Sequence, residues 1–171
     1  MNPPRDPAAA INRPWHGTRG EMLVVLQFVL VGAFFFAPPW NPWLAPDAPA
    51  STGIARSAAL SILSGTAGAM AALALMKIRR YLTPLPYPVA HSELVTSGIY
   101  GWVRHPLYSC QLIAGLGWTI YSLSALHLGL LVAGFLFFDY KATIEERWLT
   151  ERHPGYPAYA NRVRKLLPWL Y

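Results

Sequence analysis

The sequence has 171 residues, of which 54% are hydrophobic and only 13% are charged. Soluble domains carry roughly 25% charged residues, so this composition indicates an integral membrane protein of about one domain. The net charge of +6 does not indicate nucleic-acid binding, because the basic residues form short clusters beside apolar runs rather than one basic stripe. The single cysteine excludes an internal disulfide, and no histidines are paired at metal-ligand spacing, so no metal site is expected.

The first half of the chain predicts a polar arm followed by two membrane helices. Residues 1–20 are rich in proline and arginine and are expected to form a cytoplasmic arm. Apolar runs at residues 22–37 and 54–76 predict the first two spanning helices, within a segment of residues 21–80. Small residues recur every four positions in the second helix and predict a face for close helix packing: Ser57, Ser61, Gly65 and Ala69.

The second half, residues 81–171, predicts a proline-rich loop, a helical hairpin and a basic C-terminal segment. The third helix is expected to begin at Pro106, with His105 at its N-cap, and to run to about Leu123. The fourth helix is expected over residues 125–152, and Pro154 ends it. At 1.5 Å per residue that helix measures about 42 Å, so it extends beyond a hydrocarbon layer of about 30 Å.

The distribution of basic residues predicts the orientation. The arm, the loop after the second helix and the C-terminal segment hold most of the cations, which places both termini in the cytoplasm. An even number of spans follows, and the prediction is an all-α membrane protein with four transmembrane helices. The basic and apolar residues after Pro154 suit a short helix lying on an anionic leaflet.

Two charged clusters are the candidate site. Arg104 and His105 precede a helix N-terminus, whose partial positive charge adds to theirs, so an anion is expected there. That anion is a protein carboxylate, a lipid phosphate or a bound ligand. Glu145 and Glu146 supply carboxylates, although Glu145 and Lys141 are also spaced as a helix-surface ion pair.

The hairpin is expected to bring the two clusters together on the cytoplasmic side. The resulting pocket would have a cationic wall, an anionic wall and aromatic rings from Tyr100, Trp102, Tyr108, Trp148, Tyr156 and Tyr159. A zwitterionic ligand with an aromatic ring matches such walls, because guanidinium groups bind carboxylates and aromatic faces attract cations. S-adenosylmethionine has these groups.

The segments Thr96–Tyr108 and Glu145–Leu149, followed by Tyr156, Tyr159 and Leu167-Pro168, resemble the isoprenylcysteine carboxyl methyltransferase and phospholipid methyltransferase family. The resemblance implies an all-helical membrane enzyme that binds S-adenosylmethionine in a cytoplasmic pocket, which the C-terminal segment closes. A lipophilic acceptor would enter from the bilayer. The resemblance implies catalytic roles for Arg104, His105 and Glu146. The cofactor-binding residues it implies are Tyr100, Arg104, His105, Pro106, Tyr108, Glu145, Glu146, Leu149, Tyr156 and Tyr159.

The acceptor stays open among an isoprenylcysteine-like carboxylate, a thiol and a phospholipid amine. A carboxylate or thiolate needs alignment more than a base, whereas an amine must lose a proton, to His105 or to a glutamate. Cys110 is expected to pack in the third helix rather than to react. Two other functions are considered: an NADPH-dependent enzyme like the sterol reductases, and a non-catalytic membrane protein that binds anionic lipids.

Overall fold

The computed structural model describes residues 17, 20–42, 52–79, 93–168 and 171. The predictions for most of the arm and for residues 81–92 lie outside these residues. The described helices are α1 (Glu21–Phe36), α2 (Gly53–Ile78), the short 3-10 helix η3 (Gly98–Gly101), α3 (Pro106–Ser122), α4 (Ala125–Arg152) and α5 (Tyr156–Ala160). The predicted all-α class is confirmed for the described residues, in which a lone bridge between Val103 and Arg164 is the one β interaction.

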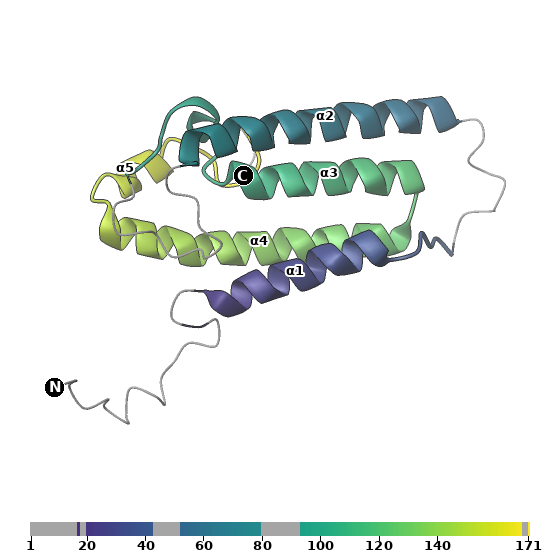
Figure 1. Ribbon diagram of the computed structural model, residues 1–171, viewed down its shortest axis with the longest axis horizontal. Coiled ribbons are helices and arrows are strands. Elements are labelled where there is room, and N and C mark those ends of the chain that lie inside the picture. Colours follow the sequence, from purple (N-terminus) through teal and green to yellow (C-terminus); the bar gives the residue numbers. More distant parts are fainter. Residues whose placement is uncertain (1–16, 18–19, 43–51, 80–92, 169–170) are drawn as a thin grey trace, which may run out of the picture.

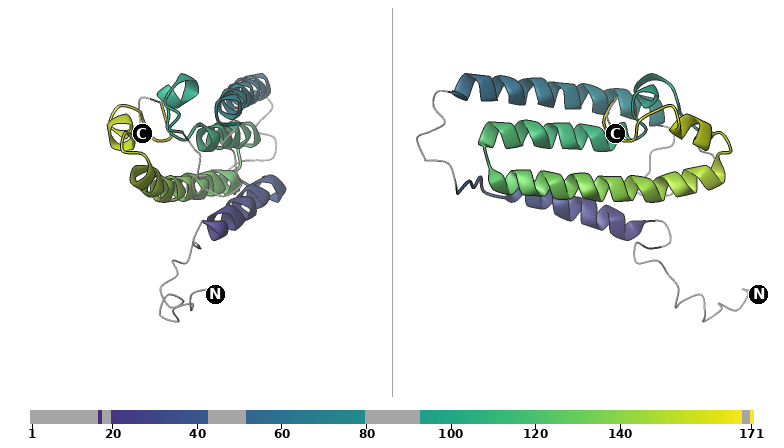
Figure 2. Two further views of the ribbon diagram at one scale, coloured as in Figure 1. Left: turned by 60° about the vertical axis from the view of Figure 1, so that its left-hand side comes forward. Right: turned by 180° about the vertical axis from the view of Figure 1, so that it is seen from behind.

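The helices lie side by side with α3 between α2 and α4, and α1 runs along α4 (Figures 1 and 2). At one end, called here the α5 end, α1 and α3 begin and α2 and α4 finish. Two described helices, α2 and α4, are long and apolar enough to cross a membrane, and α1 is a shorter apolar helix of 16 residues. Four spanning helices therefore remain a prediction.

The interface between α2 and α3 corrects one prediction. Ala67, Met70 and Ala74 are the buried residues of α2, whereas Ser57, Ser61 and Gly65 are exposed. The expected small-residue stripe therefore does not face α3. The close approach comes instead from Gly117 on α3, where an added Cβ would lie 3.1 Å from Cβ of Leu63.

At the end opposite α5, polar contacts join the turn between α3 and α4 to the segment that follows α1. Leu123 adopts a left-handed conformation (φ 50°) and ends α3. Ser124 caps α4 by accepting from the His127 backbone N–H at 3.2 Å, and it also accepts from the backbone N–H of Trp40 at 3.0 Å. The turn between α3 and α4 is thereby joined to the segment after α1, which fixes the pairing of the hairpin.

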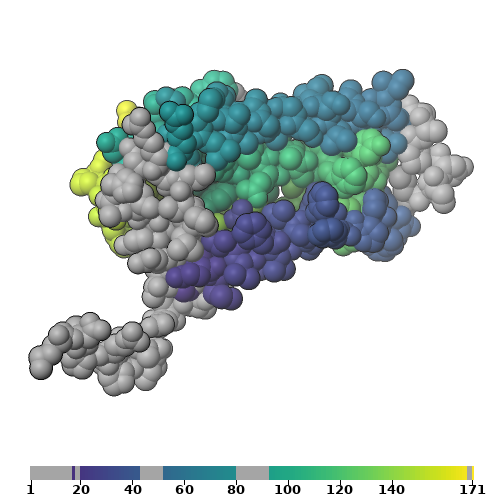
Figure 3. Space-filling view, viewed as in Figure 1, coloured from purple at the N-terminus to yellow at the C-terminus, as the bar shows by residue number. Residues whose placement is uncertain are grey.

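Large apolar side chains cover the outer faces of the bundle. Phe28, Phe35 and Phe36 of α1 are among the most exposed, at 71%, 79% and 82%. In the space-filling view α1 and α2 flank a band of α3 and α4 that reaches the surface (Figure 3). Such a surface suits lipid rather than water, because soluble proteins seldom expose apolar patches of this extent.

Candidate functional site

The entry to α3 is built from backbone contacts with the C-terminal segment. Gly98 opens η3 with φ +66°, a conformation that favours glycine, and an added Cβ would lie 3.1 Å from Cε of Lys77. The backbone N–H of Arg104 then donates to the carbonyl of Arg164 at 2.8 Å, and that of His105 donates to Lys165 at 3.1 Å. His105 is the N-cap and Pro106 the first residue of α3, as predicted.

Arg104 binds a carboxylate of the protein. Its Nε lies 2.8 Å from Oε1 of Glu146, and its side chain is only 12% exposed. The same guanidinium donates to the backbone carbonyls of Ala160, at 2.9 Å, and of Val163. Burial acts to lower the pKa of Arg104, but the hydrogen bond and charge of Glu146 outweigh it and raise that pKa. Three anions were considered as partners of Arg104: a protein carboxylate, a lipid phosphate and a bound ligand. In the described residues the partner is a protein carboxylate, that of Glu146.

His105 lies between the two glutamates. Its Nε2 is 3.0 Å from Oε1 of Glu146, and its Nδ1 is 3.5 Å from Oε2 of Glu145. Burial acts to lower the pKa of His105, but hydrogen bonds and charge attraction from both carboxylates outweigh it and raise that pKa. A carboxylate at each ring nitrogen favours the doubly protonated ring. In this arrangement the imidazolium has no lone pair with which to act as a base.

The far side of Glu145 is occupied by Tyr108 and Lys141. The Tyr108 hydroxyl donates to Glu145, and the Tyr108 ring stacks on His105 with centroids 5.5 Å apart. Lys141 is buried, with its Nζ 5.1 Å from the centroid of Tyr108 and 2.6 Å from Oε1 of Gln27 on α1. The alternative of a surface ion pair between Lys141 and Glu145 is therefore wrong, because both residues are buried and Lys141 donates to Gln27.

A second ion pair fastens the C-terminal segment over this cluster. Nζ of Lys165 lies 2.5 Å from Oδ1 of Asp139 and 2.7 Å from Oγ1 of Thr143, both on α4. The hydroxyl of Ser109 on α3 lies 2.5 Å from the carbonyl of Leu166, which is fully buried. After Pro154 only α5 is helical among the described residues, and residues 161–168 tie α3 to α4, so the predicted contact of this segment with a leaflet stays a prediction.

These fastening contacts were not predicted from the sequence. Asp139 interrupts the apolar run of α4 and was the available signal. No comparable signal marked its partner Lys165, because Lys165 lies in a segment where basic residues alternate with apolar ones.

The tyrosines expected at the site surround the charged cluster. Tyr156 and Tyr159 of α5 are buried, and the Tyr159 hydroxyl donates to the carbonyl of Tyr100 at 2.6 Å. Burial raises the pKa of Tyr100, and it raises the pKa of Tyr159 to about 12, so both stay protonated at neutral pH. The buried Tyr156 hydroxyl lies beside Arg104 and Glu146 and interacts with both, although its geometry toward neither is that of a well-formed hydrogen bond.

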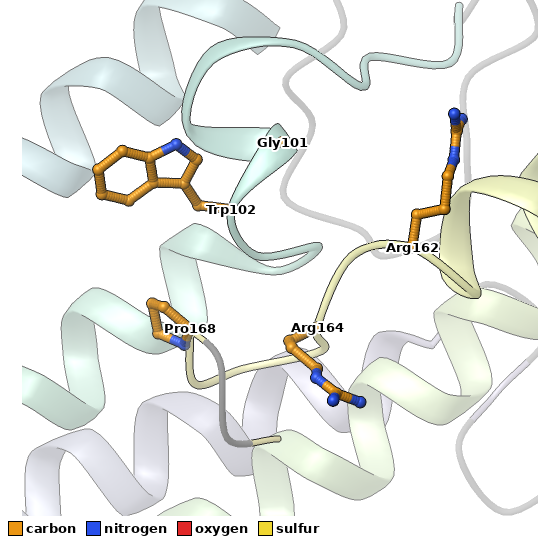
Figure 4. Close-up of a pocket in the computed structure, with 5 residues that line it drawn as sticks. All are labelled: Gly101, Trp102, Arg162, Arg164 and Pro168. Carbon is orange, nitrogen blue, oxygen red and sulfur yellow. The ribbon is translucent and has the colours of Figure 1, made fainter.

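For three other residues that were predicted to line the site, the described contacts are not side-chain hydrogen bonds or ion pairs with the charged cluster. Trp148 packs against the apolar core of α1, α3 and α4, and Leu149 accepts the N–H of His153 through its carbonyl at 2.8 Å. Trp102 is 61% exposed and lines a separate hollow with Gly101, Arg162, Arg164 and Pro168 (Figure 4). Around the cluster itself, the described structure therefore brings together Tyr100, Arg104, His105, Pro106, Tyr108, Glu145, Glu146, Tyr156 and Tyr159.

Comparison with known proteins identifies a family. Residues 54–154 match the family model described as Phospholipid methyltransferase, and this match contains both charged clusters. The chain is also 29% identical over 154 residues to the cobalt-zinc-cadmium resistance protein CzcN of Cupriavidus metallidurans. That alignment covers 88% of this chain and 63% of the relative, so the chain spans less than two thirds of the relative's length. Because the family model matches more than half of the sequence, the chain belongs to the phospholipid methyltransferase family of membrane proteins.

Proposed function

We propose that this membrane protein transfers a methyl group from S-adenosylmethionine to a lipophilic acceptor. One observation carries the proposal: the family segment brings Arg104 and His105 into a single hydrogen-bonded cluster with Glu145 and Glu146. Arg104 and His105 precede the first residue of α3, and Glu145 and Glu146 lie on α4. Such a cluster at the α5 end offers recognition groups of both signs, which a zwitterionic cofactor requires.

The charges of the cluster support binding of a carboxylate. Among the described residues Arg104 and His105 pair with Glu145 and Glu146, and Lys165 pairs with Asp139. A ligand carboxylate could take the place of a glutamate beside Arg104 and His105, because guanidinium and imidazolium groups bind carboxylates.

The buried Tyr156 hydroxyl is a second point of fit. The Tyr156 hydroxyl has no well-formed hydrogen bond to its neighbours, so a ligand that bonds to it gains affinity. Tyr156 lies beside Arg104 and Glu146. The residues present therefore fit a ligand with polar groups at this position.

The roles of the residues follow from this arrangement. Bound there, S-adenosylmethionine would supply an electrophilic methyl group. Arg104 and the imidazolium of His105 orient a carboxylate, and Glu145 and Glu146 attract an ammonium or ribose hydroxyls. Tyr108, Tyr156 and Tyr159 exclude water from the cluster. The chain aligns its reactants rather than supplying a strong base, which favours acceptors that are already nucleophilic at neutral pH.

Calorimetric titration of the detergent-solubilised protein tests the cofactor. We expect binding of S-adenosylmethionine and none of NADPH. Arg104→Ala and Glu146→Ala should abolish this binding, but both residues also hold the fold. Tyr156→Phe is therefore the cleaner variant, because it removes only a hydroxyl and should weaken affinity by about tenfold, the equivalent of one hydrogen bond. The matched control is Tyr121→Phe at the opposite end of α3.

The outcomes separate the candidate functions. Unchanged affinity in Tyr156→Phe would place the cofactor away from α5, and binding of NADPH alone would favour a reductase. Binding of neither would favour a lipid-binding protein. The acceptor is then identified by incubating the protein with a lipid extract and cofactor labelled in its methyl group, followed by mass spectrometry of the methylated products.

A further inference from the structure

Helix α1 lies outside the residues that match the family model, yet polar side chains connect it to the charged cluster. The family match covers residues 54–154, and α1 precedes them. Gln27, near the middle of α1, contacts both neighbouring helices: its Oε1 accepts from Nζ of Lys141 on α4 at 2.6 Å, and its Nε2 donates to Oε1 of Gln111 on α3 at 3.3 Å. Gln111 is itself fixed, because its Nε2 donates to the carbonyl of Leu107 at 2.8 Å. The side chain of Gln27 therefore reaches the interior of the bundle.

Lys141 connects Gln27 to Tyr108. Lys141 is only 4% exposed, and its Nζ lies over the ring of Tyr108, 5.1 Å from the centroid. An ammonium at this distance is attracted to the aromatic ring, and the attraction is stronger where water is excluded. A lysine side chain is flexible, so these two contacts hold the ammonium in one place. Because Gln27 belongs to α1 and Tyr108 to α3, the position of Lys141 depends on helices other than its own.

Tyr108 in turn fixes two members of the charged cluster. Its hydroxyl donates to Glu145, and its ring lies nearly parallel to that of His105, at an angle of 2° with centroids 5.5 Å apart. A shift of the ring would move its hydroxyl away from Glu145, whose Oε2 lies 3.5 Å from Nδ1 of His105. The arrangement of Glu145 and His105 therefore depends on the contact between Lys141 and Tyr108.

We propose that Gln27 and Lys141 are positioning residues of the cofactor site. Gln27 holds Lys141 over the ring of Tyr108, and Tyr108 holds Glu145 beside His105. This inference rests on the proposed binding of S-adenosylmethionine at the cluster, and it gives neither positioning residue a contact with that cofactor. Such support matters because a ligand loses affinity when the groups that contact it are free to move. Helix α1 thereby contributes to a site whose charged residues all lie on later elements.

The first test is the affinity of the full chain in detergent for S-adenosylmethionine, measured by calorimetric titration. We expect Gln27→Leu and Lys141→Met each to weaken binding by about tenfold, the equivalent of one contact of a charged group. Lys141→Arg keeps a cation that stacks on aromatic rings, so its affinity should stay within about threefold of the wild type. The matched control is Phe28→Leu on the exposed face of α1, which should leave the affinity unchanged.

A double variant separates positioning from a role in stability alone. In Gln27→Leu/Lys141→Met neither polar group remains, so the stability lost in Gln27→Leu should be recovered. The affinity should nevertheless stay about tenfold weaker than in the wild type, because the ring of Tyr108 still lacks the ammonium. If the affinity recovers together with the stability, Gln27 and Lys141 only hold the fold and the proposal is wrong.

A second readout does not require the cofactor. The imidazole nitrogen resonances of histidine-labelled protein, assigned with His105→Gln, report the hydrogen bonds of both ring nitrogens of His105. Gln27→Leu keeps the charge of Lys141 but releases its ammonium, so it should shift these resonances, whereas Phe28→Leu should not. Unchanged resonances in both Gln27→Leu and Lys141→Met would overturn the positioning role. If the resonances shift but the wild type binds no S-adenosylmethionine, the proposed cofactor is wrong, and the connection between α1 and the cluster stands.

Discussion

His105 holds its charge because a carboxylate faces each nitrogen of its ring. The usual pKa of histidine is about 6.5, and the pKa of His105 in the folded protein lies above it. Because folding raises this pKa, the stabilisation is fully present below about pH 6.5 and is lost as the pH rises through the folded pKa. We expect the melting temperature in detergent to fall as the pH increases from about 6.5 to 9.

The variant that tests this is His105→Gln, which should flatten the decline because glutamine does not titrate. His153→Gln provides the control, since His153 lies beyond the end of α4 and outside the cluster. If His105→Gln melts with the same pH dependence as the wild type, another group titrates and the imidazolium assignment is wrong.

At the scale of elements, Gln27 and Lys141 form the polar contact that fixes α1 against the rest of the bundle. Oε1 of Gln27 accepts from Lys141, and Nε2 of Gln27 donates to Oε1 of Gln111 on α3 at 3.3 Å. Most of the remaining surface of α1 is apolar and exposed. This contact lies within the apolar bundle, where a polar group without a partner is unfavourable.

Removing one partner should therefore be worse than removing both. We expect Gln27→Leu to destabilise the protein by about 1–3 kcal/mol, because Lys141 keeps its charge but loses its acceptor. In Gln27→Leu/Lys141→Met neither polar group remains, and stability should recover most of that loss. Reversible unfolding by SDS in mixed micelles measures the double-mutant cycle. Additive losses would show that the two side chains are not coupled in the membrane-embedded protein.

The elements show which features were predictable from local sequence. Both ends of α4 matched the prediction, because Ser124 and Pro154 are local start and stop signals. The packing face of α2 was predicted wrongly, because the glycine that permits close contact is Gly117 on the partner helix. The buried face of a membrane helix depends on its neighbour, and the spacing within one apolar helix does not reveal it.

For the whole molecule, the sequence predicted those features of the site that follow from the order and direction of the helices. An antiparallel hairpin must bring Arg104 and Glu146 to the same end, and the structure places them 2.8 Å apart. The strap formed by residues 161–168 was not predictable, because apart from the contacts of Lys165 with α4 it is held largely through backbone carbonyls and a bridge to Val103. Every residue offers these groups, so no sequence pattern marks them.

The same topology argument gives the last prediction, on the arrangement in the membrane. If α1 to α4 all cross the bilayer, the α5 end faces the cytoplasm and the start of α2 faces outward, as the distribution of basic residues indicates. The native Cys110 is buried, and replacing it with alanine removes the one thiol. Thr52→Cys then places a thiol at the start of α2, and Glu151→Cys places one at the end of α4; both positions are exposed.

A membrane-impermeant maleimide should label Thr52→Cys in intact cells and Glu151→Cys only after permeabilisation. The reverse pattern would invert the protein and place the charged cluster outside, away from a cytoplasmic supply of cofactor. Labelling of both positions in intact cells would mean that α2 or α4 does not cross the membrane, against their length and apolar composition. The predicted topology and the proposed cofactor depend on each other, because the charged cluster that would bind S-adenosylmethionine lies at the α5 end.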